Sequence, residues 1–315
     1  MSLRYAARSR PATMVSTWLN GLDGSTVQHS GYFCSGGAFT TVNRFTFVDD
    51  ARSTLATGLS ANSDSGAGMA DSNVAGYVAI GVEGAGRVDT VDKFAASTDA
   101  RSTLGNGLSA ARYSEGAMAN SGTAGYFGGG KEAANVSTVD KFAFPGDGRT
   151  TLGTGLSIAR QWLSGMANSG TAGYFGGGYP PVRSTVDKFA FSDDSRSTLG
   201  TGLSAARSSA AAMANSGTAG YFCGGWTGSN VNTVDKFAFS DDSRTTLGTG
   251  LSYDGNGPGG MANSGTAGYV GGGDDGGNVT TVDKFAFSDD SRTTLSTGLS
   301  FAPYSPAAFA NCEAL

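Results

Sequence analysis

The sequence has little histidine, cysteine or charge, and each shortage argues against a class of protein. It holds one histidine and three cysteines with no CxxC pair, which argues against a zinc site or a disulfide scaffold. Charged residues make up 15%, which argues against coiled coils, and the net charge of −5 argues against a duplex-DNA binder. We therefore expect no metal, no cofactor and no nucleic-acid partner.

Long apolar runs are also missing. The opening segment carries Arg4, Arg8 and Arg10 without the apolar stretch of a secretory signal, and no later segment is long enough to cross a membrane. No window keeps a 3.6-residue apolar period, so we expect almost no helix. A hydrophobic fraction of 39% nevertheless separates the chain from disordered glycine-rich linkers.

Glycine is the residue in excess, with 51 of the 315 positions, and much of it belongs to an internal repeat. The phrase TVDKFAF recurs at spacings of 47 to 49 residues, with a Gly-Tyr pair before each copy and TL…GLS after it. Its valine marks six copies: Val42, Val91, Val139, Val186, Val234 and Val282.

One repeat divides into four short strands, which we predict at 210–215, 218–225, 232–239 and 244–252, separated by Gly, Ser, Asn and Asp. Six such units predict an all-β protein, a six-bladed β-propeller of four-stranded antiparallel blades. Residues 307–314 match a first strand with no second strand after it, so we expect them to complete the N-terminal blade and close the ring. The predicted division is an arm at 1–24 and a propeller at 25–315.

The residues GYFGGG at 125–130 and VDKFAF at 139–144 resemble the kelch repeat, which has a glycine doublet after an aromatic and then a third strand of this kind. The resemblance covers residues 25–315, but Thr-Leu stands where kelch repeats have a tryptophan at the fourth strand. The chain is thus similar to a degenerate kelch-like propeller of the glycine-rich kind found in phage virions. The resemblance implies a virion protein, such as a tail or capsid decoration.

Each copy also carries an Asp-Lys pair (Asn-Arg in the first copy) in its third strand and an Asp-x-Arg group after it. These could form six identical ligand or calcium sites, but SDDSR offers few oxygens and places an arginine among them. We favour structural pairing between blades. A methionine recurs in the first strand of five copies, and we interpret this set as packing beside the central channel.

The turns between the first and second strands, and between the third and fourth, are nearly constant, whereas the other two sets of loops vary. Because consecutive strands alternate direction, the constant turns and the variable loops must lie on opposite faces. The variable loops carry aromatic and arginine residues that favour recognition of a protein or a sugar. The predicted binding residues are Arg112, Tyr113, Arg160, Trp162, Tyr179, Arg183, Trp226, Tyr253 and Tyr304.

These patterns favour a non-enzymatic structural or attachment protein of a virion, assembled in the host cytoplasm. Its variable face would contact a host surface protein, a glycan or a neighbouring subunit, without entering a membrane. The arm would bind other virion subunits through Arg4, Tyr5, Arg8 and Arg10. Two alternatives stay open: a cytoplasmic kelch-type interaction scaffold, and a carbohydrate-active enzyme of sialidase or lyase type, which the single histidine and the lack of a unique acid pair disfavour.

Overall fold

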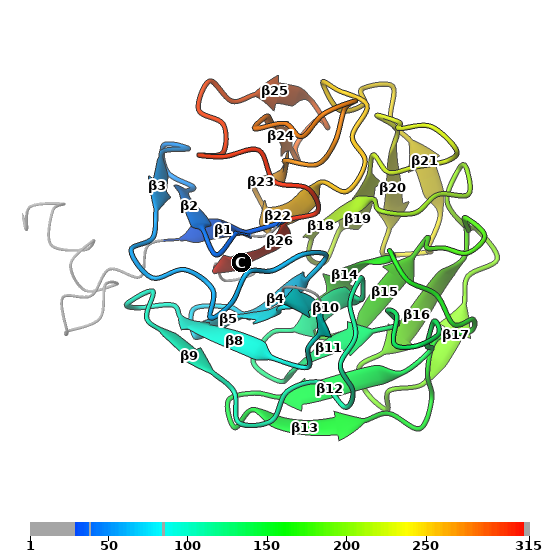
Figure 1. Ribbon diagram of the computed structural model, residues 1–315. Helices are drawn as coiled ribbons and strands as arrows, with labels where there is room; N and C mark the ends of the chain where they lie inside the picture. The colour runs from blue at the N-terminus through cyan, green and yellow to red at the C-terminus, as the bar shows by residue number, and fades with distance from the viewer. Residues whose placement is uncertain (1–28, 38, 84–85, 312–315) are drawn as a thin grey trace, which may run out of the picture.

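The computed structural model describes residues 29–37, 39–83 and 86–311. These residues form six four-stranded antiparallel sheets that radiate around a central axis, which confirms the predicted six-bladed β-propeller (Figure 1). A further two-stranded hairpin lies within the second repeat. No helix among the described residues is long and apolar enough to cross a membrane.

The blades follow one another along the chain, and each is given from its innermost to its outermost strand. Blade 1 comprises β26 (Ala307–Asn311), β1 (Ser30–Cys34), β2 (Val42–Thr46) and β3 (Arg52–Thr54). Blade 2 comprises β4 (Ala67–Asp71), β5 (Ala75–Ala79), β8 (Val91–Ala95) and β9 (Arg101–Thr103), with the hairpin β6 (Val82–Glu83) and β7 (Gly86–Arg87). Blade 3 comprises β10 (Gly116–Asn120), β11 (Ala124–Gly128), β12 (Val139–Ala143) and β13 (Gly148–Thr151).

The remaining three blades repeat this order. Blade 4 comprises β14 (Ser164–Asn168), β15 (Ala172–Gly176), β16 (Val186–Ala190) and β17 (Arg196–Thr198). Blade 5 comprises β18 (Ala211–Asn215), β19 (Ala219–Cys223), β20 (Val234–Ala238) and β21 (Arg244–Thr246). Blade 6 comprises β22 (Gly259–Asn263), β23 (Ala267–Gly271), β24 (Val282–Ala286) and β25 (Arg292–Thr294).

The ring closes as the sequence predicts, because the last strand joins the first blade. Strand β26 pairs with β1 in antiparallel register, from Ser30 opposite Asn311 to Cys34 opposite Ala307. Closure gives both strands a partner and removes two exposed edges. The predicted arm, residues 1–24, lies outside the described residues, as do Arg4, Tyr5, Arg8 and Arg10.

The fourth strand of each blade is shorter than the sequence suggests. We expected a strand over 244–252, but β21 ends at Thr246. The chain then turns inward. The amide of Leu251 donates to the carbonyl oxygen of Asn232, and a β-carbon at Gly250 would lie 2.5 Å from that oxygen. These residues therefore form the connector to the next blade, and they leave only a short exposed edge.

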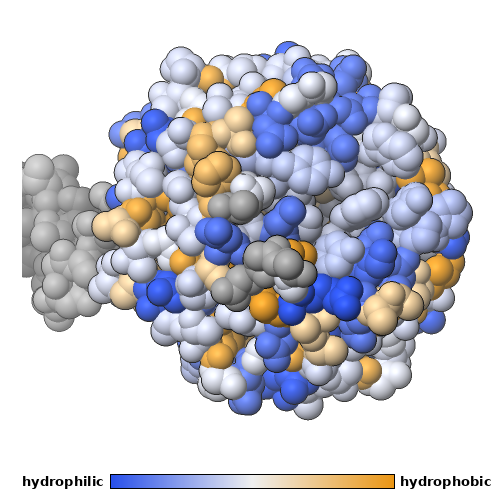
Figure 2. Space-filling view, viewed as in Figure 1, coloured by the Kyte–Doolittle hydropathy of each residue, from blue (hydrophilic) through white to orange (hydrophobic). Residues whose placement is uncertain are grey.

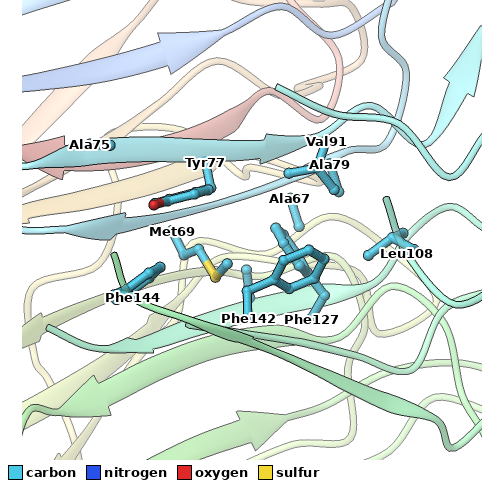
Figure 3. Packing of buried hydrophobic residues seen from close by; sticks show 11 residues of the cluster. Ala67, Met69, Ala75, Tyr77, Ala79, Val91, Leu108, Phe127, Phe142 and Phe144 are labelled. Carbon is cyan, nitrogen blue, oxygen red and sulfur yellow. The ribbon is translucent and has the colours of Figure 1, made fainter. Parts of the chain in front are cut away.

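The core lies between the blades. Phe127 and Phe142 of blade 3 pack against Tyr77 and Val91 of blade 2, and Met69 fills the space between them (Figure 3). This confirms that a face rich in phenylalanine packs against the smaller face of its neighbour. The methionine set is also confirmed as packing: Met69 is 3% exposed, and the corresponding residues are Met118, Met166, Met213, Met261 and Phe309.

The glycine of each Gly-Tyr pair makes this packing possible. A β-carbon at Gly220 would lie 2.2 Å from the sulfur of Met166, which reaches over from the preceding blade. The same approach recurs around the ring, for example between Gly173 and Met118 at 2.1 Å. Glycine is required there because the neighbouring blade occupies the volume of any side chain.

Candidate functional site

The propeller has two faces that differ in sequence. Strand directions place the turns between first and second strands, and between third and fourth strands, on one side, which we name the constant face. The other two sets of loops form the variable face. The predicted separation of constant and variable segments is therefore confirmed, and it divides residues into scaffold and candidate site.

The recurrent lysine, tyrosine and aspartate near the constant face join adjacent blades. Lys93 of blade 2 forms a 2.7 Å ion pair with Asp147 of blade 3, and the Tyr77 hydroxyl donates to the same carboxylate at 2.8 Å. Burial and this hydrogen bond raise the pKa of Tyr77 well above its usual value. The other pairs are Arg44–Asp99, Lys141–Asp194, Lys188–Asp242, Lys236–Asp290 and Lys284–Asp50.

These pairs confirm structural pairing between blades as the role of the repeated charges. Asp147 has a φ of 57°, and the equivalent aspartates share this left-handed conformation, which aspartate tolerates better than most residues. Among the described residues, no three His, Cys, Asp or Glu side chains are grouped as metal ligands. The last pair, Lys284 with Asp50, joins blade 6 to blade 1, so the charges also close the ring.

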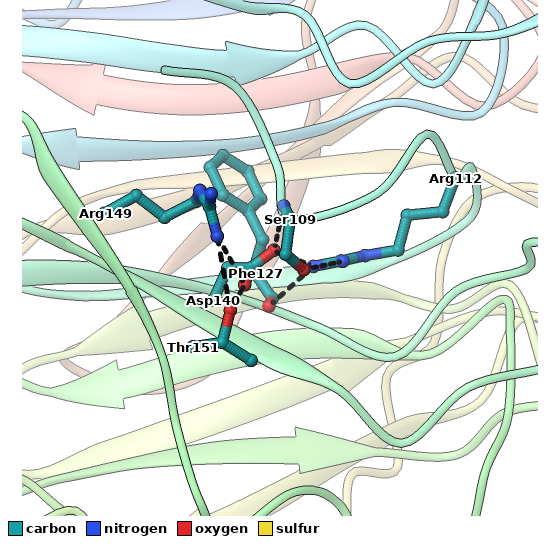
Figure 4. A network of polar contacts seen from close by, with 6 residues as sticks. All are labelled: Ser109, Arg112, Phe127, Asp140, Arg149 and Thr151. Atoms are coloured by element: carbon teal, nitrogen blue, oxygen red, sulfur yellow. Dashed lines mark hydrogen bonds and ion pairs between the residues drawn. The ribbon is translucent and has the colours of Figure 1, made fainter.

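The aspartate of the third strand organises the variable side of blades 2 to 6, and Asn43 takes its place in blade 1. Asp140 is fully buried and accepts hydrogen bonds from the amide and hydroxyl of Ser109, from Thr151 and from Arg112 (Figure 4). Burial acts to raise the pKa of Asp140, but Arg112 and these hydrogen bonds outweigh it and lower the pKa below its usual value. The loop from blade 2 is thereby attached to blade 3.

Three predicted binding residues belong to this scaffold, and the expectation that they are exposed is wrong. Arg112 and Arg160 are fully buried and pair with Asp140 and Asp187 at 2.8 and 3.0 Å. Tyr253 is 8% exposed, and its hydroxyl donates to the carbonyl of Gly272. They are buried because the connectors turn inward, so none of them can contact a partner.

A signal for the buried arginines was present in the repeat. Arg112, Arg160 and Arg207 each stand three residues after the serine of GLS, and Arg207 pairs with Asp235 at 2.9 Å. Variation among the loops hid this shared position. The equivalent residues of the other repeats are Gly255, Pro303 and Ser63.

Three of the predicted residues do come together on the variable face. The rings of Trp162 and Tyr179 lie 5.5 Å apart, and Tyr179 meets Trp226 edge-on at 6.5 Å. They come from three different loops around blades 4 and 5, and all three are half-buried. Backbone bridges fix the loops, since Gln161 pairs with Tyr179 and Ser208 with Trp226. We name Trp162, Tyr179 and Trp226 the aromatic cluster.

The remaining predicted residues lie elsewhere on the variable face. Tyr113, Arg183 and Tyr304 are half-buried, and no ring contact among the described residues joins either tyrosine to the aromatic cluster. Sequence reasoning missed Phe39, which is 47% exposed and packs against Phe301 at 5.1 Å. On the face that Figure 2 shows, hydrophobic residues lie scattered among hydrophilic ones.

A ring of equivalent residues surrounds the mouth of the central channel on the variable face, and backbone hydrogen bonds join four consecutive pairs of them. The amide of Ser114 donates to Ser65, that of Trp162 to Ser114, and that of Ser209 to Trp162. The residues of this ring have positive φ: Ser65, Ser114, Trp162, Ser209, Gly257 and Ser305. They border a hollow of about 100 Å³ whose lining is mostly serine, glycine and alanine.

One lining residue has its carboxyl group in an unusual environment. Glu115 is 4% exposed, and neither carboxylate oxygen has a hydrogen-bond partner among the described residues. Burial raises the pKa of Glu115 to about 7, against the opposing effect of Arg112. The glutamate was not singled out from the sequence, where it resembles an ordinary loop residue.

The fold and these contacts define a six-bladed β-propeller with a structural charge network and an aromatic cluster beside its channel. Neither a family model nor a curated protein sequence matches the chain. Among solved structures, the chain is similar to one titled "Structure of YjhT", with a TM-score of 0.62 and 14% identity, over 78% of this chain and 86% of that one. At this identity the likeness shows the fold alone.

Proposed function

We propose that the protein is a non-enzymatic recognition protein that binds its partner through the variable face while the opposite face holds it in place. One observation carries the proposal. Ser30 pairs with Asn311, so the described chain begins and ends together on the constant face, away from the aromatic cluster. This arrangement suits an attachment protein, because one face can be tethered while the other is presented.

The constant face is built for rigidity. The amide of Ser72 donates to the hydroxyl of Ser121, and Ser121, Ser169 and Ser216 continue the same contact to the next blade. Loops on such a scaffold can differ in sequence without loss of the fold. The variation of the opposite loops therefore supports a role in recognition.

The chemistry of the repeat supports a non-enzymatic role. The recurrent aspartates, lysines and tyrosines are engaged in contacts between blades, as in Tyr126 and Lys141 with Asp194. His29, which a Ser-His-Asp triad would need, is exposed and precedes β1 on the constant face. Contacts between blades therefore account for the recurrent aspartates, lysines and tyrosines.

The setting that we propose is a phage particle, with a host surface protein or glycan as the partner and kelch-like propellers as distant kin. This part rests on the resemblance of the repeats. Deleting residues 1–24 should abolish incorporation into particles in that setting. A cellular interaction scaffold would keep its partner after the same deletion, and so the two settings can be told apart.

Photo-crosslinking in the native source tests the recognition proposal. Benzoylphenylalanine would replace Ser229, which is exposed on the variable face, or, as the matched control, Val74, which is 47% exposed on a constant-face turn. The proposal predicts that position 229 captures a partner that position 74 does not. Capture of the same molecules in equal yield from both positions would refute it.

A further inference from the structure

The conformation of Trp162 is unusual for a residue of its size. Its φ is 53°, whereas the equivalent positions of the other repeats hold serine or glycine: Ser65, Ser114, Ser209, Gly257 and Ser305. A bulky side chain in the left-handed region is an outlier with a steric cost. Trp162 therefore occupies the ring at the channel mouth against the local preference of the backbone, which indicates that the indole has a function there.

The position of the indole suggests which function. Trp162 lines the hollow at the channel mouth and also packs against Tyr179, which in turn meets Trp226. Since the loops are bridged to one another, the three rings are held in place before any ligand arrives. Half-buried rings of this kind offer one face for stacking while the other remains anchored.

The lining of the hollow decides between classes of ligand. An apolar peptide side chain would require an apolar pocket, but here the wall is mostly serine, glycine and alanine around one indole, with Leu163 and two prolines as its larger apolar residues. Ser114 and Glu115 line the hollow, and their side-chain oxygens have no hydrogen-bond partner among the described residues. These oxygens are closed to solvent, so the side chains that can meet the hydroxyl groups of a ligand are those of other lining serines, such as Ser209 and Ser305.

We propose that the channel mouth binds a sugar ring, which stacks on Trp162 beside Tyr179 and Trp226 and directs its hydroxyl groups into the serine-lined hollow. The C–H groups of a pyranose carry a slight positive charge and complement the negative face of an indole. The inference rests on the proposed function, because it names the ligand class of the same variable face.

Tryptophan fluorescence and a printed oligosaccharide array test this proposal together. The chain has three tryptophans, so Trp18→Phe leaves Trp162 and Trp226, both in the aromatic cluster, as the reporters. The array would carry neutral hexose, N-acetylhexosamine and sialic acid oligosaccharides, and those that bind would be titrated in solution. We expect binding that shifts the fluorescence and weakens tenfold or more in Trp162→Gly and in Trp226→Ala. The matched control Phe39→Ala, at an exposed aromatic residue of another blade, should bind as the parent does.

Thermal unfolding separates a binding role from a structural one. Trp162→Gly relieves the left-handed strain but loses the contact with Tyr179, so we expect a melting temperature within roughly 2 °C of the parent or above it. A fall of more than roughly 6 °C would assign Trp162 to the scaffold and overturn the proposal.

An array with no bound oligosaccharide, or unchanged binding by Trp162→Gly, would also overturn the sugar proposal. If crosslinking from position 229 still captures a partner, the proposed function stands and the ligand belongs to another class. If that crosslinking fails as well, the proposed function is lost.

Discussion

The buried carboxyl of Glu115 makes the stability of the propeller depend on pH in a way that one substitution should remove. Burial raises its pKa from 4.5 to about 7, so the native state holds the proton more tightly than the unfolded chain does. The stability that the protonated carboxyl of Glu115 contributes is therefore complete below pH 4.5, falls as the pH rises from 4.5 to about 7, and is lost above that pH. At 1.36 kcal/mol for each pH unit, the loss is about 3 kcal/mol.

Urea unfolding of the parent and Glu115→Gln between pH 4 and pH 8 measures this effect. Other titrating groups cancel in the difference between the two proteins, provided that they lie far from position 115. We expect the variant to gain about 3 kcal/mol relative to the parent across this range. Glu115→Leu should be more stable still at pH 8, because the equivalent Leu163 packs in an apolar cluster between blades. Parallel pH profiles for parent and Glu115→Gln would refute the reasoning.

Three further predictions concern the scaffold. Phe142→Ala should cost about 3–5 kcal/mol in urea unfolding, because the ring is fully buried against Phe127 and leaves a cavity between blades; a loss below about 1 kcal/mol would contradict this packing. Arg160→Met should cost about 3–5 kcal/mol, because the buried charge of Asp187 then keeps only its longer ion pair, with Arg196 at 3.7 Å, whereas the double variant Arg160→Met/Asp187→Asn should recover most of that loss. Deleting residues 307–315 removes β26 and should abolish the cooperative thermal transition; an unchanged transition would disprove closure of the ring through this strand.

Much of the fold follows from the sequence because the repeat makes the same structural demand six times. The position of Val139 and its equivalents locates the third strand of every blade, and the unmatched strand at the C-terminus predicts the closure. The fourth strands are too long in the prediction. A glycine-rich segment such as that around Gly250 carries strand-like residues, and its inward turn depends on contacts with Asn232 of the same blade and, through the amide of Ser252, with Asp283 of the next blade.

The site was less predictable, since its residues meet through the arrangement of blades. Trp162 and Trp226 are 64 positions apart, and Tyr179 joins them because neighbouring loops bend toward the channel. The burial of Arg112 could not be read from a loop that varies in its other positions. The strain at Trp162 has no signature in sequence until the serines at the equivalent positions are known to have positive φ.

The direct test of the account is whether the partner binds on the variable face and not on the constant one. Blade 5 offers a matched pair of exposed serines: Ser229, in the loop of Trp226, and Ser240, in a constant-face turn. Cys34 and Cys223 are buried, so with Cys312→Ser a maleimide biotin would label Ser229→Cys or Ser240→Cys and orient the protein on a biosensor. Albumin conjugates of the arrayed oligosaccharides should bind the surface attached through position 240 and not the surface attached through position 229. Equal binding to both surfaces, or binding to the second alone, would contradict the account.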